Sequence, residues 1–187
     1  MEIAIDVKKI KKSVLRPFGW AYSPNAIAQE IQESLLNYSK TLDFTPANRR
    51  QGKVDQEFNQ ASASMSHPDL LWLCSALDNL TSNVCEESFP ITTIDVHQYS
   101  AGGYITRHRD FKRNLGLIYL LTLEGSAQFT IDDVRRNEIT TQPRSLLILR
   151  GVLPDDEKDY RPYHRVSSLT NRVSIGLRHF LPTGGRY

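Results

Sequence analysis

The sequence predicts a mainly β (α+β) chain, in which a double-stranded β-helix, or jelly roll, has N-terminal helices packed outside it. Two observations lead to this fold class. Up to about residue 90 the apolar residues recur at helical spacing, whereas beyond it short β-type runs alternate with turn residues. About eight such runs, with no helical pattern between them, favour an antiparallel jelly roll over a parallel α/β sheet.

Composition places the chain among ordinary globular proteins. Its 187 residues fit one domain, and its contents of 40% hydrophobic and 24% charged residues are typical of soluble proteins. We expect residues 1–187 to form a single domain, with a helical extension and lid over residues 1–90 and a jelly-roll core over residues 91–180.

Membrane and export signals are missing from the sequence. No apolar run approaches the roughly 20 residues of a membrane span, and the N-terminal stretch lacks the apolar region of a signal peptide. We therefore expect a cytoplasmic protein with no membrane partner, in which Cys74 and Cys85 remain thiols. A net charge of +2 is too small to indicate nucleic-acid binding by itself.

Two helices are predicted before residue 90. The first contains Ile27, Ile31 and Leu35 at helical spacing, with Ser23 or Asn25 as its cap. The second begins near Pro68, which suits a first helical turn, and its leucines recur through Leu70, Leu73, Leu77 and Leu80. The polar stretch between them, residues 45–66, is expected to be a long loop or an irregular hairpin.

The second half contains the predicted strands, separated by turn residues. An acidic, proline-bearing stretch at residues 151–162 is the longest gap between them, and we expect it to be a mobile loop over a site. The strands are expected near Ile91–Tyr99, Ile105–His108, Leu115–Leu123, Ala127–Ile131, Glu138–Thr141, Ser145–Arg150, His164–Leu169 and Arg172–Phe180.

A metal site is predicted from the placement of the histidines. His108 and Asp110 are two residues apart, and on a strand such positions share one face. His164, at the start of a later strand, can supply a third ligand. Two imidazoles and one carboxylate leave open positions on an ion, as non-haem Fe(II) oxygenases require. An isolated His-x-Asp is, however, common by chance as a surface hydrogen-bonded pair, so the motif needs further support.

The C-terminal strand provides that support. Its apolar residues Val173, Ile175 and Leu177 alternate with a second face that contains Arg172 and Arg178, separated only by small residues. If this face looks into the barrel, the guanidinium groups can bind the carboxylates of a diacid. The alternative is that the arginines are solvent-facing charges of an edge strand.

Together these features resemble the AlkB-like branch of the Fe(II)/2-oxoglutarate-dependent dioxygenases. The matched stretch covers roughly residues 91–180, about half the chain. Its elements occur in the expected order: Tyr99 before a glycine-bearing turn, His108-x-Asp110, His164, and Arg172 with Arg178. The resemblance implies that His108, Asp110 and His164 are catalytic residues that hold Fe(II), that residues 91–180 are a catalytic core, and that residues 1–90 include a substrate lid.

The resemblance also implies how the cosubstrates are used. Arg172, with the Tyr99 hydroxyl, would bind the distal carboxylate of 2-oxoglutarate, and Arg178 would lie near its metal-proximal end. O2 would then oxidise 2-oxoglutarate to succinate and CO2 while a C–H bond of the substrate is hydroxylated. An N-methyl carbon hydroxylated in this way would leave as formaldehyde.

Two positions depart from the pattern of the repair enzymes in this family. His97 stands where those enzymes often have Asn, and Lys112 stands where they commonly have an acidic residue that reads the damaged base. These changes leave the iron and cosubstrate assignments intact and weaken the assignment to base repair.

Three hypotheses about function remain open from the sequence. The first is hydroxylation or oxidative demethylation of alkylated, single-stranded or damaged nucleic acid, for which cations at residues 107–113, aromatic residues at 16–22 and basic residues at 49–53 are suitable. The second is the same chemistry on a small molecule, such as an amino acid or a biosynthetic intermediate. The third is a jelly-roll binding protein without turnover. Phe18 and Trp20 could equally be core anchors of an ordinary edge strand.

Overall fold

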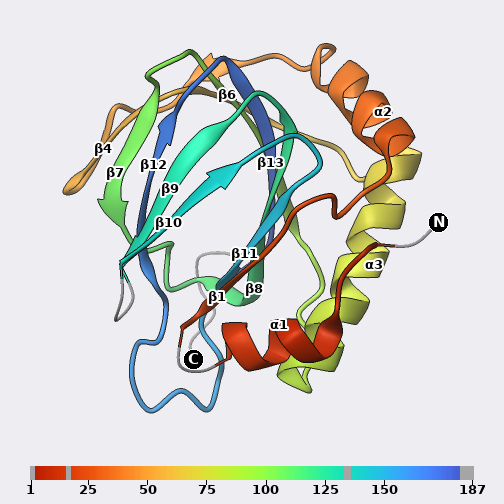
Figure 1. The fold of residues 1–187 in the computed structure, drawn as a ribbon, viewed down its shortest axis with the longest axis vertical. Coiled ribbons are helices and arrows are strands. Elements are labelled where there is room, and N and C mark those ends of the chain that lie inside the picture. The colour runs from red at the N-terminus through yellow and green to blue at the C-terminus, as the bar shows by residue number, and fades with distance from the viewer. Residues whose placement is uncertain (1–2, 16–17, 133–135, 182–187) are drawn as a thin grey trace.

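The structure is a computed structural model that describes residues 3–15, 18–132 and 136–181, and it confirms the predicted fold class. Two antiparallel sheets face each other, one with the order β1-β11-β8-β13-β6-β5-β2 and the other with the order β10-β9-β12-β7-β4-β3. Figure 1 shows the sheets enclosing a barrel, with the helices outside it.

The helices are α1 Val7–Val14, α2 Gln29–Ser39 and α3 Pro68–Cys85. The strands are β1 Trp20–Ser23, β2 Thr45–Pro46, β3 Arg50–Gln51, β4 Val54–Glu57, β5 Asn59–Ser62, β6 Thr93–Tyr99, β7 Tyr104–His108, β8 Asn114–Glu124, β9 Ala127–Asp132, β10 Asn137–Thr141, β11 Leu146–Arg150, β12 Tyr163–Ser168 and β13 Arg172–Phe180.

All of the strands predicted after residue 90 are present. They are β6 to β13, and their ends lie within about two residues of the predicted ones. The alternation of apolar and polar residues that predicted them reflects burial of one face in the barrel or beneath the helices. The strands predicted for this half are thereby confirmed.

The first half contains strands that the sequence analysis named only as alternatives, an edge strand near Trp20 and an irregular hairpin over residues 45–66. β1 pairs with β11 at the edge of the larger sheet, β4 pairs with β7, and β5 pairs with β6. Because β2 pairs with β5 and β3 with β4 at one register, the stretch 45–66 contains one irregular hairpin, which extends both sheets on one side of the barrel. Its residues are mostly polar because these short strands bury few side chains, as the exposed pattern of β5 shows. The division of the chain at residue 90 stays a prediction.

The predicted helices are present, with different starts. α3 has Pro68 at its first position, as predicted, whereas α2 begins after Ala28 with no side-chain cap. The predicted caps were wrong: Ser23 belongs to β1, and Asn25 takes a left-handed conformation with a φ of 65°. α1 was not predicted; the Asp6 side chain caps it by accepting a hydrogen bond from the Lys9 amide at 3.1 Å.

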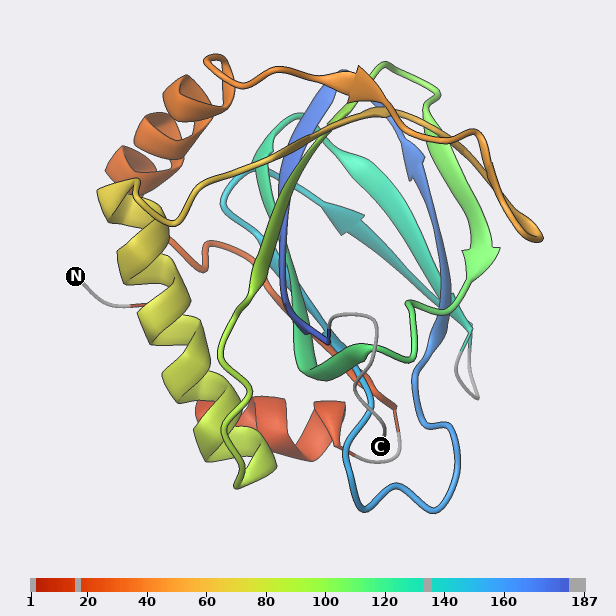
Figure 2. The same ribbon diagram turned by 180° about the vertical axis from the view of Figure 1, so that it is seen from behind.

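Two apolar clusters hold the layers together. The larger lies between the helices and the outer face of the larger sheet, and Figure 2 shows α2 and α3 along that face. It is built from residues of α3, such as Leu73 and Leu77, and from strand residues such as Val96 and Ile175. The smaller cluster fills part of the barrel and includes Tyr99, Phe129 and Leu149. Burial of these faces provides the main driving force for the fold.

Two further features of the helices bear on the sequence predictions. No helix in the described ranges is long and apolar enough to cross a membrane. Cys74 and Cys85 both lie in α3 as free thiols, as predicted, and burial raises the pKa of Cys74 to about 12 and that of Cys85 to about 11.

Candidate metal and cosubstrate site

The three predicted metal ligands come together at one end of the barrel. β7 ends at His108, β12 begins next to it with His164 paired to His108, and Asp110 follows directly after β7. One potential ligand atom from each residue lies within 4.8 Å of the others. The prediction placed His108 and Asp110 on one strand; instead the strand stops at His108, and the short segment that follows carries the carboxylate to the same place.

Hydrogen bonds fix which nitrogen of each imidazole is available to a metal. The Nδ1–H of His108 donates to the Thr106 carbonyl at 2.8 Å, and that of His164 faces the Pro162 carbonyl at 3.3 Å. Because a carbonyl can only accept, Nδ1 bears the hydrogen and Nε2 keeps a free lone pair on both rings. Burial lowers the pKa of His164 to about 4, so this ring is neutral and able to bind a cation at neutral pH.

The Asp110 carboxylate is the negative group of the cluster. Burial by itself would raise its pKa, but the opposing effects of His164, His108, Arg178 and Arg161 hold the pKa below the usual value. Its Oδ2 lies 3.7 Å from Nε2 of His164. Two imidazoles beside one carboxylate match the donor set of a non-haem Fe(II) centre, and this set leaves positions free for other ligands.

Arg172 lies inside the barrel, as the alternation of β13 predicted. Its strand is central, between β8 and β6, which excludes the edge-strand alternative. The side chain is 2% exposed, donates to the Thr122 hydroxyl at 3.3 Å, and lies over the rings of Tyr99 and Phe129. In the described part of the chain no carboxylate pairs with it, and its Nε has no partner. A buried guanidinium without a counter-ion is costly, and it is well suited to bind a carboxylate ligand.

Tyr99 is the neighbour of Arg172 across the sheet. Burial raises the pKa of Tyr99 to about 12, so its hydroxyl stays protonated and can donate a hydrogen bond. Its ring stacks on Phe58 with centroids 5.0 Å apart. Arg172 and Tyr99 are therefore adjacent donors inside the barrel, as the resemblance implied.

Arg178 occupies the same face of β13, and the structure shows a partner for it that the sequence analysis missed. Its guanidinium forms an ion pair with Asp95, whose strand β6 is adjacent. Gly176 leaves space for the side chains of Arg178 and His97. A Cβ at this position would lie 3.4 Å from the Arg178 guanidinium and 3.7 Å from the His97 ring. The alternation of β6 places Asp95, His97 and Tyr99 on one face, and this signal could have identified Asp95 from the sequence.

His97 is half-buried and lies on the same face of β6 as Asp95 and Tyr99. Burial, followed by the charges of Arg178 and Arg172, lowers the pKa of His97 to about 3. The ring is therefore neutral at physiological pH. The ring contacts that of Phe58, with centroids 4.9 Å apart. His97 is thus a neutral polar group beside the cationic side chains of Arg172 and Arg178.

A second network that the sequence analysis missed holds the metal-ligand segment in place. Arg161 is 7% exposed and donates to the backbone carbonyl of Asp110. Its Nε and Nη2 bind the two carboxylate oxygens of Asp159 at 2.9 and 2.6 Å, and Arg109 binds the same carboxylate at 3.1 Å. These contacts tie the segment around Asp110 to the start of β12, which carries His164. No local sequence signal indicates the contacts of Arg161 with Asp110 and of Arg109 with Asp159, because these partners are 51 and 50 positions apart.

The loop at residues 151–162 lies at the same end of the barrel as the triad (Figure 1). Its position near a site agrees with the prediction. It is anchored at two points: Arg150, 3% exposed at its side chain, pairs with Asp156, and Arg109, which follows β7, pairs with Asp159. Its mobility stays a prediction.

Most of the aromatic and basic residues proposed for nucleic acid are engaged within the fold. Trp20 lies on edge strand β1 and packs against the inner cluster, as the alternative interpretation described, and Tyr22 packs there too; Phe18, the other anchor of that interpretation, belongs to neither apolar cluster. Arg107 and Arg109 are paired with Asp132 and Asp159. The basic residues at 49–53 lie on the β3–β4 hairpin, where Arg49 is 3.7 Å from a carboxylate oxygen of Asp55. Residue 16 lies outside the described residues.

Comparisons with known proteins define the class of fold. No family model matches the sequence, and no curated protein is detectably similar to it. Among solved structures, a prolyl-4-hydroxylase from Pseudomonas putida is similar with a TM-score of 0.66 and 13% identity, over 95% of this chain and 100% of that one. A 2OG-Fe(II) oxygenase family protein from Burkholderia pseudomallei has a TM-score of 0.67 and 10% identity, over 95% of this chain and 92% of that one. The structure of OsALKBH1 has a TM-score of 0.64 and 14% identity, over 88% of this chain and 99% of that one.

These matches show that the chain has the double-stranded β-helix fold of the 2-oxoglutarate and Fe(II) oxygenases. They include proteins of different names at similar TM-scores, so the AlkB-like branch is not singled out. A fold of this kind hosts many functions, and what this chain does must be argued from its own site.

Proposed function

We propose that this protein is an Fe(II)- and 2-oxoglutarate-dependent dioxygenase that hydroxylates a C–H bond of a small molecule. One observation carries the proposal: two imidazoles and a carboxylate that suit Fe(II) lie at the end of the same barrel that buries an unpaired arginine. The first group can hold the metal and the second can hold a diacid, and an enzyme of this class needs both. When the hydroxylated carbon is an N-methyl group, the product loses formaldehyde.

Each of these side chains has a role in this scheme. His108, Asp110 and His164 would hold the iron, which when bound supplies the activation of O2. Arg172, with the Tyr99 hydroxyl beside it, would bind the distal carboxylate of 2-oxoglutarate by charge-assisted hydrogen bonds.

Burial limits the access of water to the metal ligands. The metal ligands are half-buried or buried, with Asp110 19% and His164 5% exposed at their side chains. Limited contact with water protects a reactive site from side reactions and strengthens the electrostatic contacts within it. His97 and the Asp95–Arg178 pair line the interior beside the triad and would face the cosubstrate or the substrate.

A small molecule is favoured over nucleic acid because of how the cations are used. Nucleic-acid binding depends on many cations that are free to contact phosphates. Arg107 and Arg109 are instead engaged with carboxylates and stacked on the ring of Tyr163, at 3.7 and 4.0 Å from its centroid. Alkylated nucleic acid remains the second candidate, and salt-dependent binding of a single-stranded oligonucleotide at low ionic strength would favour it.

The test is an anaerobic titration of the protein with Fe(II) and 2-oxoglutarate, monitored by the visible charge-transfer band of the chelate. We expect a band in the wild type and none in His108→Ala or His164→Ala. His179→Ala is the matched control, since that ring lies outside the triad and contacts the Pro90 carbonyl. A wild type without the band, or a band that survives both triad substitutions, contradicts the proposal.

Turnover is measured separately as succinate release under O2, in a screen of small-molecule substrates. A protein that forms the chelate and releases no succinate in any condition would be a binding protein with this fold.

A further inference from the structure

A groove of about 500 Å³ opens at the end of the barrel that carries the triad. This volume lies within the range of roughly 300–1,000 Å³ that is typical of small-molecule sites. Its apolar lining comes from β8, from the loop at residues 151–162 and from the end of the chain that the structure describes: Leu115, Val152, Leu153, Pro154 and Leu181.

The groove adjoins the segment that carries a metal ligand. Arg161 lines it and also donates to the backbone carbonyl of Asp110. Lys112, the second residue after Asp110, lines it as well. The triad side chains are not part of the lining, so a molecule in the groove would reach the metal site past Arg161 and Lys112.

Among the lining residues the cations Lys112, Arg113, Lys158 and Arg161 outnumber the carboxylates, whereas Asp155 and Glu157 of the same loop lie outside the lining. Its carboxylates, Asp156 and Asp159, are engaged by Arg150 and by Arg161. Its other cations are Lys112, Arg113 and Lys158, and within residues 3–15, 18–132 and 136–181 no carboxylate pairs with any of them. Nζ of Lys158 lies over the ring of Tyr160, 5.2 Å from its centroid.

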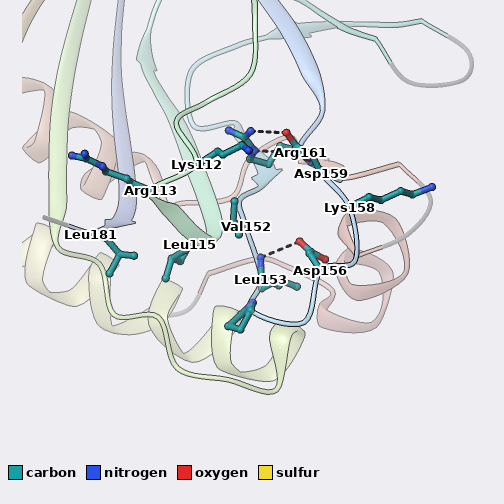
Figure 3. Close-up of a pocket in the computed structure, with 11 residues that line it drawn as sticks. Lys112, Arg113, Leu115, Val152, Leu153, Asp156, Lys158, Asp159, Arg161 and Leu181 are labelled. Atoms are coloured by element: carbon teal, nitrogen blue, oxygen red, sulfur yellow. Dashed lines mark hydrogen bonds and ion pairs between the residues drawn. The ribbon is translucent and has the colours of Figure 1, made fainter. Parts of the chain in front are cut away.

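Figure 3 shows how these cations are arranged. Lys112 extends toward Arg161 and Asp159, at the side of the groove nearest the metal ligand. Arg113 and Lys158 lie on opposite sides with their charged ends directed away from each other, and the apolar side chains of Leu115 and Val152 lie between them. Positive charge thus flanks an apolar lining, an arrangement that attracts an anion and buries an adjoining apolar segment.

We propose that this groove is the substrate site and that the substrate is a small organic anion, a carboxylate or phosphate on an apolar body. Lys112 contacts the anionic group, and Arg113 and Lys158 raise the local concentration of anions. The inference rests on the proposed function for its assignment as the substrate site. The proposal predicts that the groove selects ligands by their negative charge more than by their shape.

The experiment compares two probes that differ only in charge, 3-phenylpropanoate and 3-phenylpropanamide, with phenyl phosphate as a third arm. Binding to the full-length protein loaded with Zn(II) and saturating 2-oxoglutarate is measured by ligand-observed saturation-transfer NMR. We expect the acid to bind about tenfold more tightly than the amide, the ratio that a few partly exposed charge contacts can supply. The ratio of the affinities for phenyl phosphate and 3-phenylpropanoate then shows whether the groove prefers a phosphate or a carboxylate as the anionic group.

The groove variant is Lys112→Gln with Arg113→Gln and Lys158→Gln, in which the acid and the amide should bind within about twofold of each other. Its control is Lys8→Gln with Lys40→Gln and Arg165→Gln, which removes the same charge from exposed positions outside the groove lining and should keep the selectivity. If the triple variant folds poorly, Lys112→Gln alone should weaken acid binding about threefold and leave amide binding unchanged.

Several results would overturn the inference. They are equal binding of the acid and the amide to the wild type, selectivity that survives in the groove variant, and salt-dependent oligonucleotide binding that is lost in that variant. The charge-transfer band of the wild type is scored separately. A band without acid selectivity refutes the groove and leaves the proposed function intact, whereas acid selectivity without a band refutes the proposed function and the role of the groove as a substrate site.

Discussion

Replacement of Arg172 by methionine separates a ligand-binding arginine from a structural one. A buried arginine in an intramolecular ion pair typically costs about 3–5 kcal/mol when it is removed, because its partner charge is left behind. Arg172 has no such partner among the described residues, and its hydrogen bond to Thr122 is long at 3.3 Å. The loss of that bond is offset by removal of a desolvated charge. We expect the free energy of unfolding of the ligand-free Arg172→Met variant to lie within about 1 kcal/mol of the wild type.

The effect on 2-oxoglutarate should be much larger. At a concentration 100 times its Kd, a ligand stabilises the native state by about 2.7 kcal/mol, which raises the Tm of a domain of this size by about 5–11 °C. Loss of a buried charge-assisted pair worth about 3 kcal/mol raises the Kd roughly 100-fold. The same concentration then stabilises the variant by only about 0.4 kcal/mol, or about 1 °C.

The assay is thermal and urea unfolding of the Zn(II)-loaded protein, with and without 2-oxoglutarate. Arg165→Met, an exposed arginine on β12, is the matched control and should keep the full shift. The reasoning fails if ligand-free Arg172→Met is destabilised by about 3 kcal/mol or more, since Arg172 would then be a structural residue. It fails equally if the variant keeps the stabilisation by 2-oxoglutarate.

The remaining predictions concern three other buried groups. Arg161→Met should weaken Fe(II) binding about tenfold, because the Asp110 segment loses its support; titration of the charge-transfer band measures this, and unchanged affinity contradicts it. Arg178→Lys keeps the charge and loses the planar fork facing Asp95, so urea unfolding should show a loss of about 1 kcal/mol; an unchanged midpoint would show that the pair does not matter. The pKa of His97 is lowered by burial to about 3, so below the unfolded value of about 6.5 the unfolded chain binds more protons and the native state loses stability as pH falls. His97→Gln lacks this contribution and should lose about 2 kcal/mol less than the wild type between pH 7.5 and pH 5; parallel curves would refute the assignment.

Much of the core was predictable because strands whose two faces meet different surroundings leave a two-residue period in the sequence. The clearest case is β13, where the alternation of Val173, Ile175 and Leu177 correctly assigned Arg172 to the opposite, interior face. The same period in β6 placed Asp95 beside Tyr99, although its ion pair with Arg178 became evident only in the structure. The bounds of β1 to β5 were not predicted because these strands have only two to four residues, too few to establish such a period.

The sequence by itself determined the donor types of the site. It provides two imidazoles and a carboxylate for a metal, and an arginine whose neighbours are small enough to admit a ligand. These are properties of residue chemistry and of local alternation, which a linear pattern records.

The tertiary structure decided which of these groups meet and which charges are free. The pairing of β7 with β12 brings His164 to His108 across more than fifty residues, and only this register makes a site. It also decided that Arg109 is engaged by Asp159 while Lys112 has no acidic partner in the described chain, although the sequence presents both as cations beside Asp110. Charge pairing depends on distance in space, to which sequence spacing is a guide only within a helix or a strand.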